Sequence, residues 1–94
     1  MAKMKKIEMK IDEKEGIGVY SNIAHVIHNR SEFVIDFARM MPGLNFAKVV
    51  SRIILSPSNL KALSMALKEN VKQYEKKYGE IAIGEKYQDK KIGF

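Results

Sequence analysis

The sequence predicts an α+β fold, in which an antiparallel four-stranded meander is followed by one long C-terminal helix in a ββββα order. Three observations support this prediction. Short apolar stretches separated by turn residues fill residues 4–55. Apolar residues then change to helical spacing over residues 60–78. Pro57 stands between the two patterns, where a strand must stop and a helix can start.

The first predicted strand covers residues 4–12, where apolar and charged side chains alternate. Ile7, Met9 and Ile11 lie on one face, with Lys6, Glu8, Lys10 and Asp12 on the other. Alternation with a period of two is typical of a half-buried strand, and the charges favour a sheet edge. The polar residues 13–16 predict a turn.

The second and third predicted strands, residues 17–29 and 33–41, carry apolar residues on both faces. Gly18 near the start of the second strand suggests a bulge or a close backbone approach. The polar residues 29–32 predict the turn between the two strands, and Pro42-Gly43 predicts the turn after the third.

The fourth predicted strand, residues 46–55, is rich in β-branched residues and leads into the helix. Ser56 is the expected N-cap, with Pro57 at the first helical position, and Ser58 is the competing cap. The expected apolar stripe of the helix consists of Leu60, Leu63, Leu67, Val71, Tyr74 and Tyr78. Gly79 is expected to end the helix. After it, residues 81–83 either add a short strand or pack as a tail.

One helix is expected to cover only one face of the sheet, which leaves a second apolar face open in a monomer. Such a patch is rarely left in water and normally marks an interface between subunits or with a partner. The sequence therefore predicts a homodimer or a higher symmetric oligomer. The residues expected at its interface are Val34, Met40, Tyr74 and Tyr78.

The length of 94 residues is that of one domain. We expect a basic strand and turn at 1–15, a globular unit at 16–81, and a flexible tail at 82–94, frayed over residues 86–94. No apolar run is long enough to span a membrane, and the N-terminus lacks an apolar signal core, so a cytoplasmic location is expected. The absence of cysteine excludes disulfides, thiolate nucleophiles and cysteine-type zinc sites.

The net charge of +6 is concentrated in two segments, because residues 1–10 and 61–79 each carry +3 and the remainder sums to zero. Lysine outnumbers arginine 14 to 3, which fits diffuse electrostatics or the solvated surface of a heat-tolerant protein better than bidentate reading of bases. The alternative is a nucleic-acid footprint. The residues that would form it are Lys3, Lys5, Lys6, Lys10, Lys61, Lys68, Lys72 and Lys76.

Few side chains suggest chemistry. His25 and His28 fall on opposite faces of one predicted strand, which disfavours a shared metal. Asp36 and Arg52 lie within apolar strands and are expected to pair with each other, as a structural ion pair or as a ligand-recognition site. Ser21-Asn22 has no histidine at a triad spacing. The sequence therefore predicts no catalysis, metal or cofactor.

Four blocks of the sequence resemble a known family. They are YSN (20–22), SEFVIDFARMMPG (31–43), KVVSRIILSPSNLKAL (48–63) and ALKENVKQYEKKYGEI (66–81). They are similar to a family of short bacterial and archaeal proteins known as a domain of unknown function, over about residues 16–81. The resemblance brings no functional residues, and the lysine-rich ends are expected to lie outside it.

Two functional hypotheses follow. The first is a non-enzymatic, homo-oligomeric protein that binds DNA or RNA through its lysines. The second is a protein-interaction module that uses Met40, Met41 and the exposed sheet, by analogy with SecB-type chaperones. The coactivator fold that binds single-stranded DNA offers a similar analogy for the first.

Overall fold

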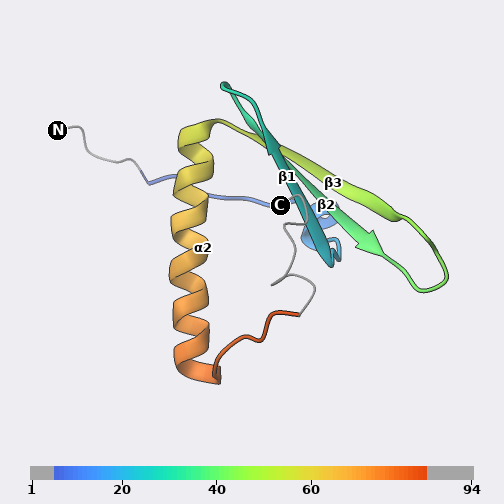
Figure 1. Cartoon of the computed structure of the whole chain (residues 1–94). Helices are drawn as coiled ribbons and strands as arrows, with labels where there is room; N and C mark the ends of the chain where they lie inside the picture. Colours follow the sequence, from blue (N-terminus) through green and yellow to red (C-terminus); the bar gives the residue numbers. More distant parts are fainter. Residues whose placement is uncertain (1–5, 85–94) are drawn as a thin grey trace.

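A computed structural model describes residues 6–84 as a three-stranded antiparallel sheet followed by one long helix (Figure 1). In chain order the elements are α1 (Glu13–Gly16), β1 (Ile23–His28), β2 (Phe33–Met40), β3 (Ala47–Leu55) and α2 (Pro57–Tyr78). The sheet order is β1-β2-β3. Within the described chain β2 is therefore central, and β1 and β3 each have one open edge.

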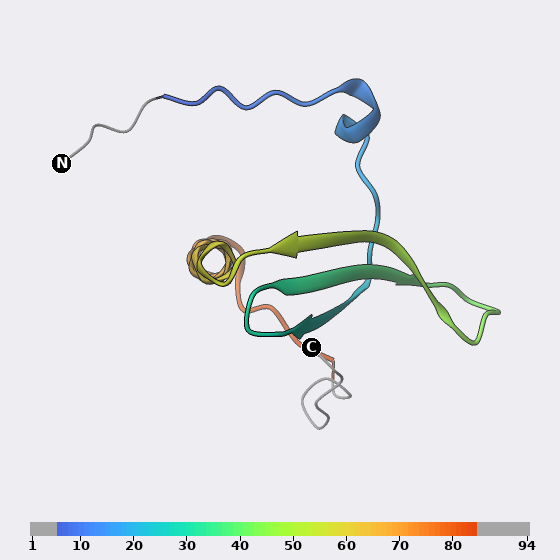
Figure 2. The same cartoon turned by 90° about the horizontal axis from the view of Figure 1, so that it is seen from above.

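The α+β class fits, but the prediction of four strands is wrong. Residues 6–12, which we call the N-terminal arm, are extended yet belong to no sheet. Figure 2 shows the arm standing apart from the strands, beyond β3. Alternation of apolar residues favours extended backbone, but a strand also needs a hydrogen-bonded neighbour, and alternation within one segment does not specify that neighbour.

The second predicted strand also starts later than expected. Residues 13–16 form the helical turn α1, and β1 begins only at Ile23. Gly18 has a φ of +83°, which lies outside the conformations of regular strands. A turn at Asn29 then connects β1 to β2, because its Oδ1 accepts hydrogen bonds from the N–H groups of Ser31 (2.8 Å) and Glu32 (2.9 Å).

The register of the sheet places His25 opposite Asp36, and Asp36 opposite Arg52. Phe37 faces Ser51 and the next residue, Ala38, faces Val49, so Val50 is the extra residue of a bulge in β3. One face of the sheet, the Ile35 face, carries Ala24, Val26, His28, Phe33, Ile35, Phe37, Ser51, Ile53 and Leu55. The other, the Asp36 face, carries Ile23, His25, Ile27, Val34, Asp36, Ala38, Arg52 and Ile54.

The predicted helix is confirmed from start to end. Ser56 is the N-cap, since its Oγ accepts a hydrogen bond from the Asn59 N–H at 3.2 Å, and Pro57 occupies the first turn. The helix ends at Gly79, whose φ is +103° and whose N–H donates to the Glu75 carbonyl. Residues 79–84 follow without regular structure, so the short strand considered at residues 81–83 is not formed.

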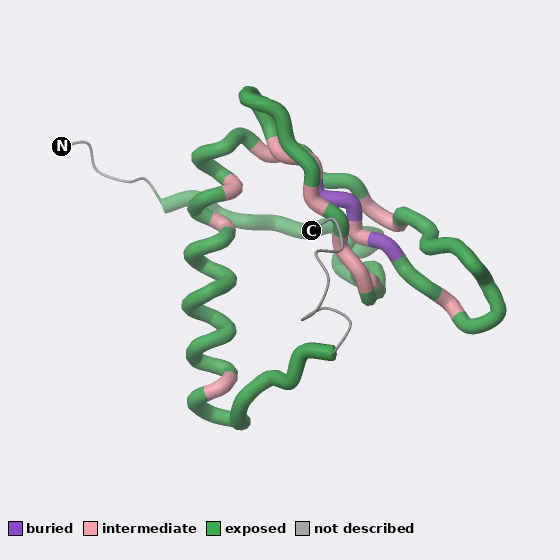
Figure 3. Tube along the Cα trace, viewed as in Figure 1, coloured by how far each residue is buried: buried purple, intermediate pink, exposed green. Residues whose placement is uncertain are grey.

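Helix α2 does not cover the sheet, contrary to the expectation that it would shield one face. No residue of α2 is buried, and α2 makes no extensive contact with any strand. Figure 3 shows burial confined to the middle of the sheet. Within the described residues, the buried hydrophobic side chains are Ile35 and Ala38, one on each face. Only Leu60 and Leu63, near the start of α2, are half-buried along its apolar stripe.

Some expectations fall outside the described residues. These are the frayed end at residues 86–94, most of the predicted tail at 82–94, and Lys3 and Lys5. None of the helices within residues 6–84 combines the length and the hydropathy that crossing a membrane requires.

The capping geometry distinguishes Ser56 from its neighbour Ser58. Replacing Ser56 with alanine removes the acceptor for the Asn59 N–H and is expected to lower the free energy of unfolding by about 1 kcal/mol. The same change at Ser58 is expected to have little effect, although the two hydroxyl oxygens lie 3.4 Å apart. Urea denaturation of S56A and S58A measures the difference. Equal losses in the two variants would contradict the assignment of the cap.

Candidate functional site

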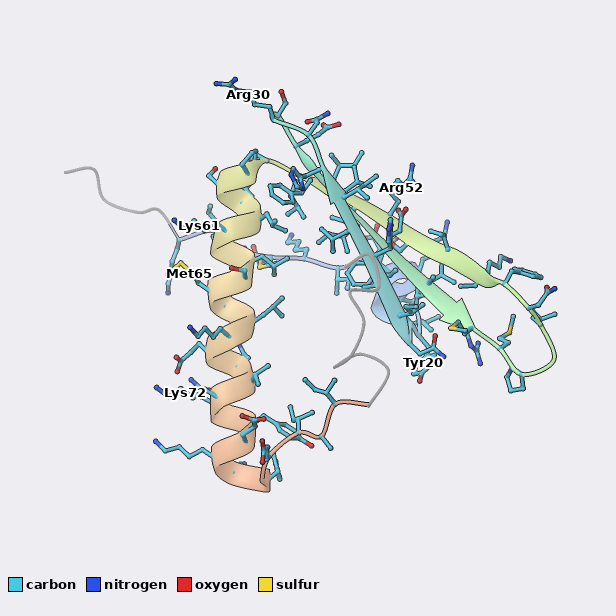
Figure 4. The ribbon with its side chains drawn as sticks, in the orientation of Figure 1. Tyr20, Arg30, Arg52, Lys61, Met65 and Lys72 are labelled. Atoms are coloured by element: carbon cyan, nitrogen blue, oxygen red, sulfur yellow. The ribbon has the colours of Figure 1, made fainter. Side chains whose placement is uncertain are left out.

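The lysine residues predicted for α2 form one exposed row, the lysine stripe: Lys61, Lys68, Lys72 and Lys76. At 1.5 Å of rise per residue, this row covers roughly 22 Å of the helix axis. In Figure 4, Lys61 and Lys72 point away from the sheet, with Met65 between them. The lysine stripe and the apolar stripe lie on different sides of the helix, because the centres of the two sets of residues are offset by somewhat more than about a third of a turn. Four of the five lysines of α2 are thus presented to solvent on one side of the helix, whereas Lys77 lies over the Tyr78 ring on another side.

The lysines of the N-terminal arm are separate from this stripe. Lys6 and Lys10 are exposed, and the arm stands clear of α2 when the helix is viewed along its axis (Figure 2). The structure therefore gives two basic elements rather than one continuous basic surface.

The predicted interface residues lie in three different places. Val34 is half-buried in the central strand, and Met40 is exposed at the end of β2. Tyr74 and Tyr78 are exposed on the last turns of α2, with ring centroids 4.9 Å apart. Within one chain they do not form a single patch.

The two ionised residues predicted inside strands do form a pair. Arg52 donates from Nε to Asp36 Oδ1 at 2.6 Å and from Nη2 to Oδ2 at 2.8 Å, which is a bidentate geometry. The Asp36 side chain is 11% exposed and that of Arg52 is 59% exposed, so the guanidinium reaches from solvent to an almost covered carboxylate.

The ion pair shifts the pKa of both of its partners towards the charged form. Hydrogen bonds from Arg52 lower the pKa of Asp36 below its ordinary value of 3.8; burial opposes this effect, and the positive charges of Arg52 and His25 add to it. The same hydrogen bonds raise the pKa of Arg52. Because each partner satisfies the other, the geometry supports the structural reading of the pair over ligand recognition.

The histidines are placed as predicted, on opposite faces. His25 lies across from Asp36, and His28 stacks on Phe33 with ring centroids 5.0 Å apart. Within residues 6–84, no three histidine, aspartate or glutamate side chains gather as metal ligands would.

Ser21 and Asn22 have a structural role that sequence reasoning missed. The Ser21 hydroxyl donates to the Ala38 carbonyl at 2.9 Å. The Asn22 side chain donates to the Met40 carbonyl at 3.0 Å and accepts from the Met40 N–H at 2.8 Å. These bonds continue the hydrogen-bond ladder between β1 and β2 past its last backbone pair, with side-chain atoms of Ser21 and Asn22 in place of backbone groups. The available signal was a Ser-Asn pair inside the stretch predicted as one strand, because such side chains often bond to the backbone where a regular strand begins or ends.

The fold and its surfaces define a small α+β protein with an uncovered three-stranded sheet and a projecting amphipathic helix. The chain belongs to the family described as "Protein of unknown function (DUF3467)", whose model matches residues 1–83. The match includes the N-terminal arm, so the family resemblance does not begin near Gly16 as expected. Comparison with curated proteins and with solved structures gave no match.

The Asp36–Arg52 pair predicts a pH dependence of stability. Because the pKa of Asp36 is lower in the folded chain, its stabilising contribution is complete well above pH 3.8 and is lost as the pH falls through the folded-state pKa. Asp36→Asn is expected to lower the melting temperature at neutral pH and to flatten its decline under acidic conditions. Thermal melts from neutral pH to about pH 2 test this. The control is Glu8→Gln, which changes an exposed carboxylate of the arm. Parallel profiles for Asp36→Asn and the unmodified protein would contradict it.

Proposed function

We propose that this protein is a non-enzymatic, self-assembling binding protein that contacts nucleic-acid phosphates through the lysine stripe of α2. The observation that carries the proposal is the alignment of Lys61, Lys68, Lys72 and Lys76 in one exposed row of α2. Within this row Lys61 and Lys72 point away from the sheet (Figure 4). An ammonium group is a compact point charge, which attracts phosphate oxygens without the planar fork that reads a base edge. Binding is therefore expected with little sequence preference.

The arm supports the same function from a second position. Its lysines, Lys6 and Lys10, add cations outside the helix, and Lys3 and Lys5 precede them in the sequence. Nucleic acid that contacts both elements would release more counterions than a complex with the helix alone. The cytoplasmic location expected from the sequence is part of this proposal.

Self-assembly is proposed because the apolar surfaces have no cover within the described chain. Ile27, Ile53 and Ile54 of the sheet and Leu67, Val71, Tyr74 and Tyr78 of the helix are exposed. Val34 and Met40 remain the residues proposed on the sheet side of the interface. Burying such surface in a second copy removes it from water, which is the main driving force for association.

An alternative function rests on the same exposed surface. A protein-interaction or chaperone-like module would hold apolar segments of other proteins on the sheet, with Met40 and Met41 as adaptable contacts. In this case the protein suppresses aggregation of an unfolded client and does not shift DNA or RNA.

The lysine stripe predicts a specific loss in a salt titration. The double variant K68S/K72S is expected to bind a labelled single-stranded oligonucleotide several-fold more weakly. The slope of log Kd against log salt concentration is expected to fall by about 0.7 to 0.9 for each lost phosphate contact. Fluorescence anisotropy between about 50 and about 200 mM salt measures both quantities.

The matched control is K14S/K48S, which removes the same charge from exposed lysines in α1 and β3. It is expected to change the slope by less than half as much. Equal effects in the two double variants would show that only the net charge matters, and salt-independent binding would remove the proposal.

A further inference from the structure

The N-terminal arm has the features of a strand without a partner. Ile7 is 82% exposed, Met9 93% and Ile11 71%, and the three alternate with polar residues. Within residues 6–84 the backbone groups of residues 6–11 form no hydrogen bond. An extended segment with unpaired amides and one apolar face is the form in which a strand is added to an exposed sheet edge.

The same chain offers such an edge in β3. Its outer side has no neighbour among the described residues. β3 has nine residues and is long enough to pair with all seven residues of the arm, whereas β1 has only six. Val49, Ile53 and Ile54 of β3 are exposed, as expected for a strand that lacks a neighbour on one side.

The exposed area indicates that a second copy is the occupant. The chain exposes 9178 Å², whereas a compact monomer of 10.8 kDa exposes about 5,500 Å². An allowance of about 2,500 Å² for the fifteen residues outside the described range still leaves more than about 1,000 Å² in excess. A stable interface buries about 800 Å² on each partner. The radius of gyration of 16.4 Å agrees, since about 12 Å is typical of a compact chain of this length.

We propose that the arm of one copy adds as a strand to the outer edge of β3 in a second copy, and that the exchange is reciprocal. Each copy supplies one arm and one edge, so a twofold pair leaves neither unused. The polar side of the arm has balanced charge, with Lys6 and Lys10 against Glu8 and Asp12. The arm also lies within the residues that the family model matches. This inference rests on the self-assembly part of the proposed function.

The first test measures mass in solution against concentration, by light scattering and sedimentation. The variant I7S/M9S/I11S keeps the charge of the arm but removes its apolar face, and its dissociation constant is expected to rise by at least about tenfold. The control K6S/E8S alters the polar side of the same arm at equal net charge and is expected to assemble like the unmodified protein. Equal assembly of all three would overturn the proposal for the arm while leaving self-assembly in place.

The second test locates the contact, and the absence of cysteine from the chain makes it specific. Met9→Cys and Ile53→Cys are made in separate chains of different mass, mixed, and treated with a short bis-maleimide. A product joining the two chains is expected, whereas Met9→Cys mixed with Lys72→Cys is expected to give little. A third sample is a single chain that carries both Met9→Cys and Ile53→Cys. If a cross-link forms only within this chain and never between two chains, the proposal is overturned, because the arm then pairs with its own sheet.

The two tests separate failure of this inference from failure of the proposed function. A protein that is monomeric at every concentration would remove both self-assembly and the exchange of arms, while the anisotropy titration still decides nucleic-acid binding. An assembled protein whose arm gives no cross-link between chains would remove the exchange alone.

Discussion

The main physical constraint on this protein is that one layer of three strands cannot bury its own two faces. Apolar residues line both sides of the sheet, yet only Ile35 and Ala38 are buried hydrophobic residues within residues 6–84. Hydrophobic stabilisation scales with the apolar area removed from water, at about 25 cal/mol for each Å². A chain this open gains little from it alone. Folding stability and association with a second copy are therefore expected to be linked, as in obligate dimers.

The Asp36–Arg52 ion pair at the centre of the sheet, whose carboxylate is almost covered, makes the register of the sheet specific. An isolated carboxylate at the Asp36 position would be costly, and the β2–β3 register places Arg52 directly opposite it. A slip of one residue would move the carboxylate to the Ile35 face, away from its guanidinium. The bulge at Val50 lies two residues before Arg52 in β3, so Asp36 and Arg52 still face each other. The pair thus selects among alignments that the apolar residues alone would accept equally.

Helix α2 separates the two proposed activities onto different sides of one element. Its apolar stripe is available for assembly, and Lys61 and Lys72 of its lysine stripe point away from the sheet (Figure 4). Assembly through the arm and the apolar surfaces would leave the lysines accessible and would bring the charge of two copies together. A higher local charge strengthens attraction to a polyanion and its dependence on salt. The two proposals are therefore compatible, although separate experiments test them.

The sequence alone determined the features that depend on residues close together in the chain, which are the ends of the helix and the first turn. The cap at Ser56, Pro57 in the first turn and Gly79 at the end set the limits of α2, and Asn29 sets the first hairpin turn. The pairing of Asp36 with Arg52 was also predictable, because an ionised residue inside an apolar strand needs a partner.

Only the tertiary structure decided the rest. The alternation in residues 6–12 specifies extended backbone but not a neighbour, so the first of the four predicted strands is an arm that joins no sheet among the described residues. The apolar stripe of α2 indicates which side of the helix favours burial, but not which surface would cover that side. The helix could therefore be predicted from the sequence, whereas its position relative to the sheet could not. Pairing and packing depend on surfaces contributed by distant residues or by another chain, and no pattern within a single segment records them.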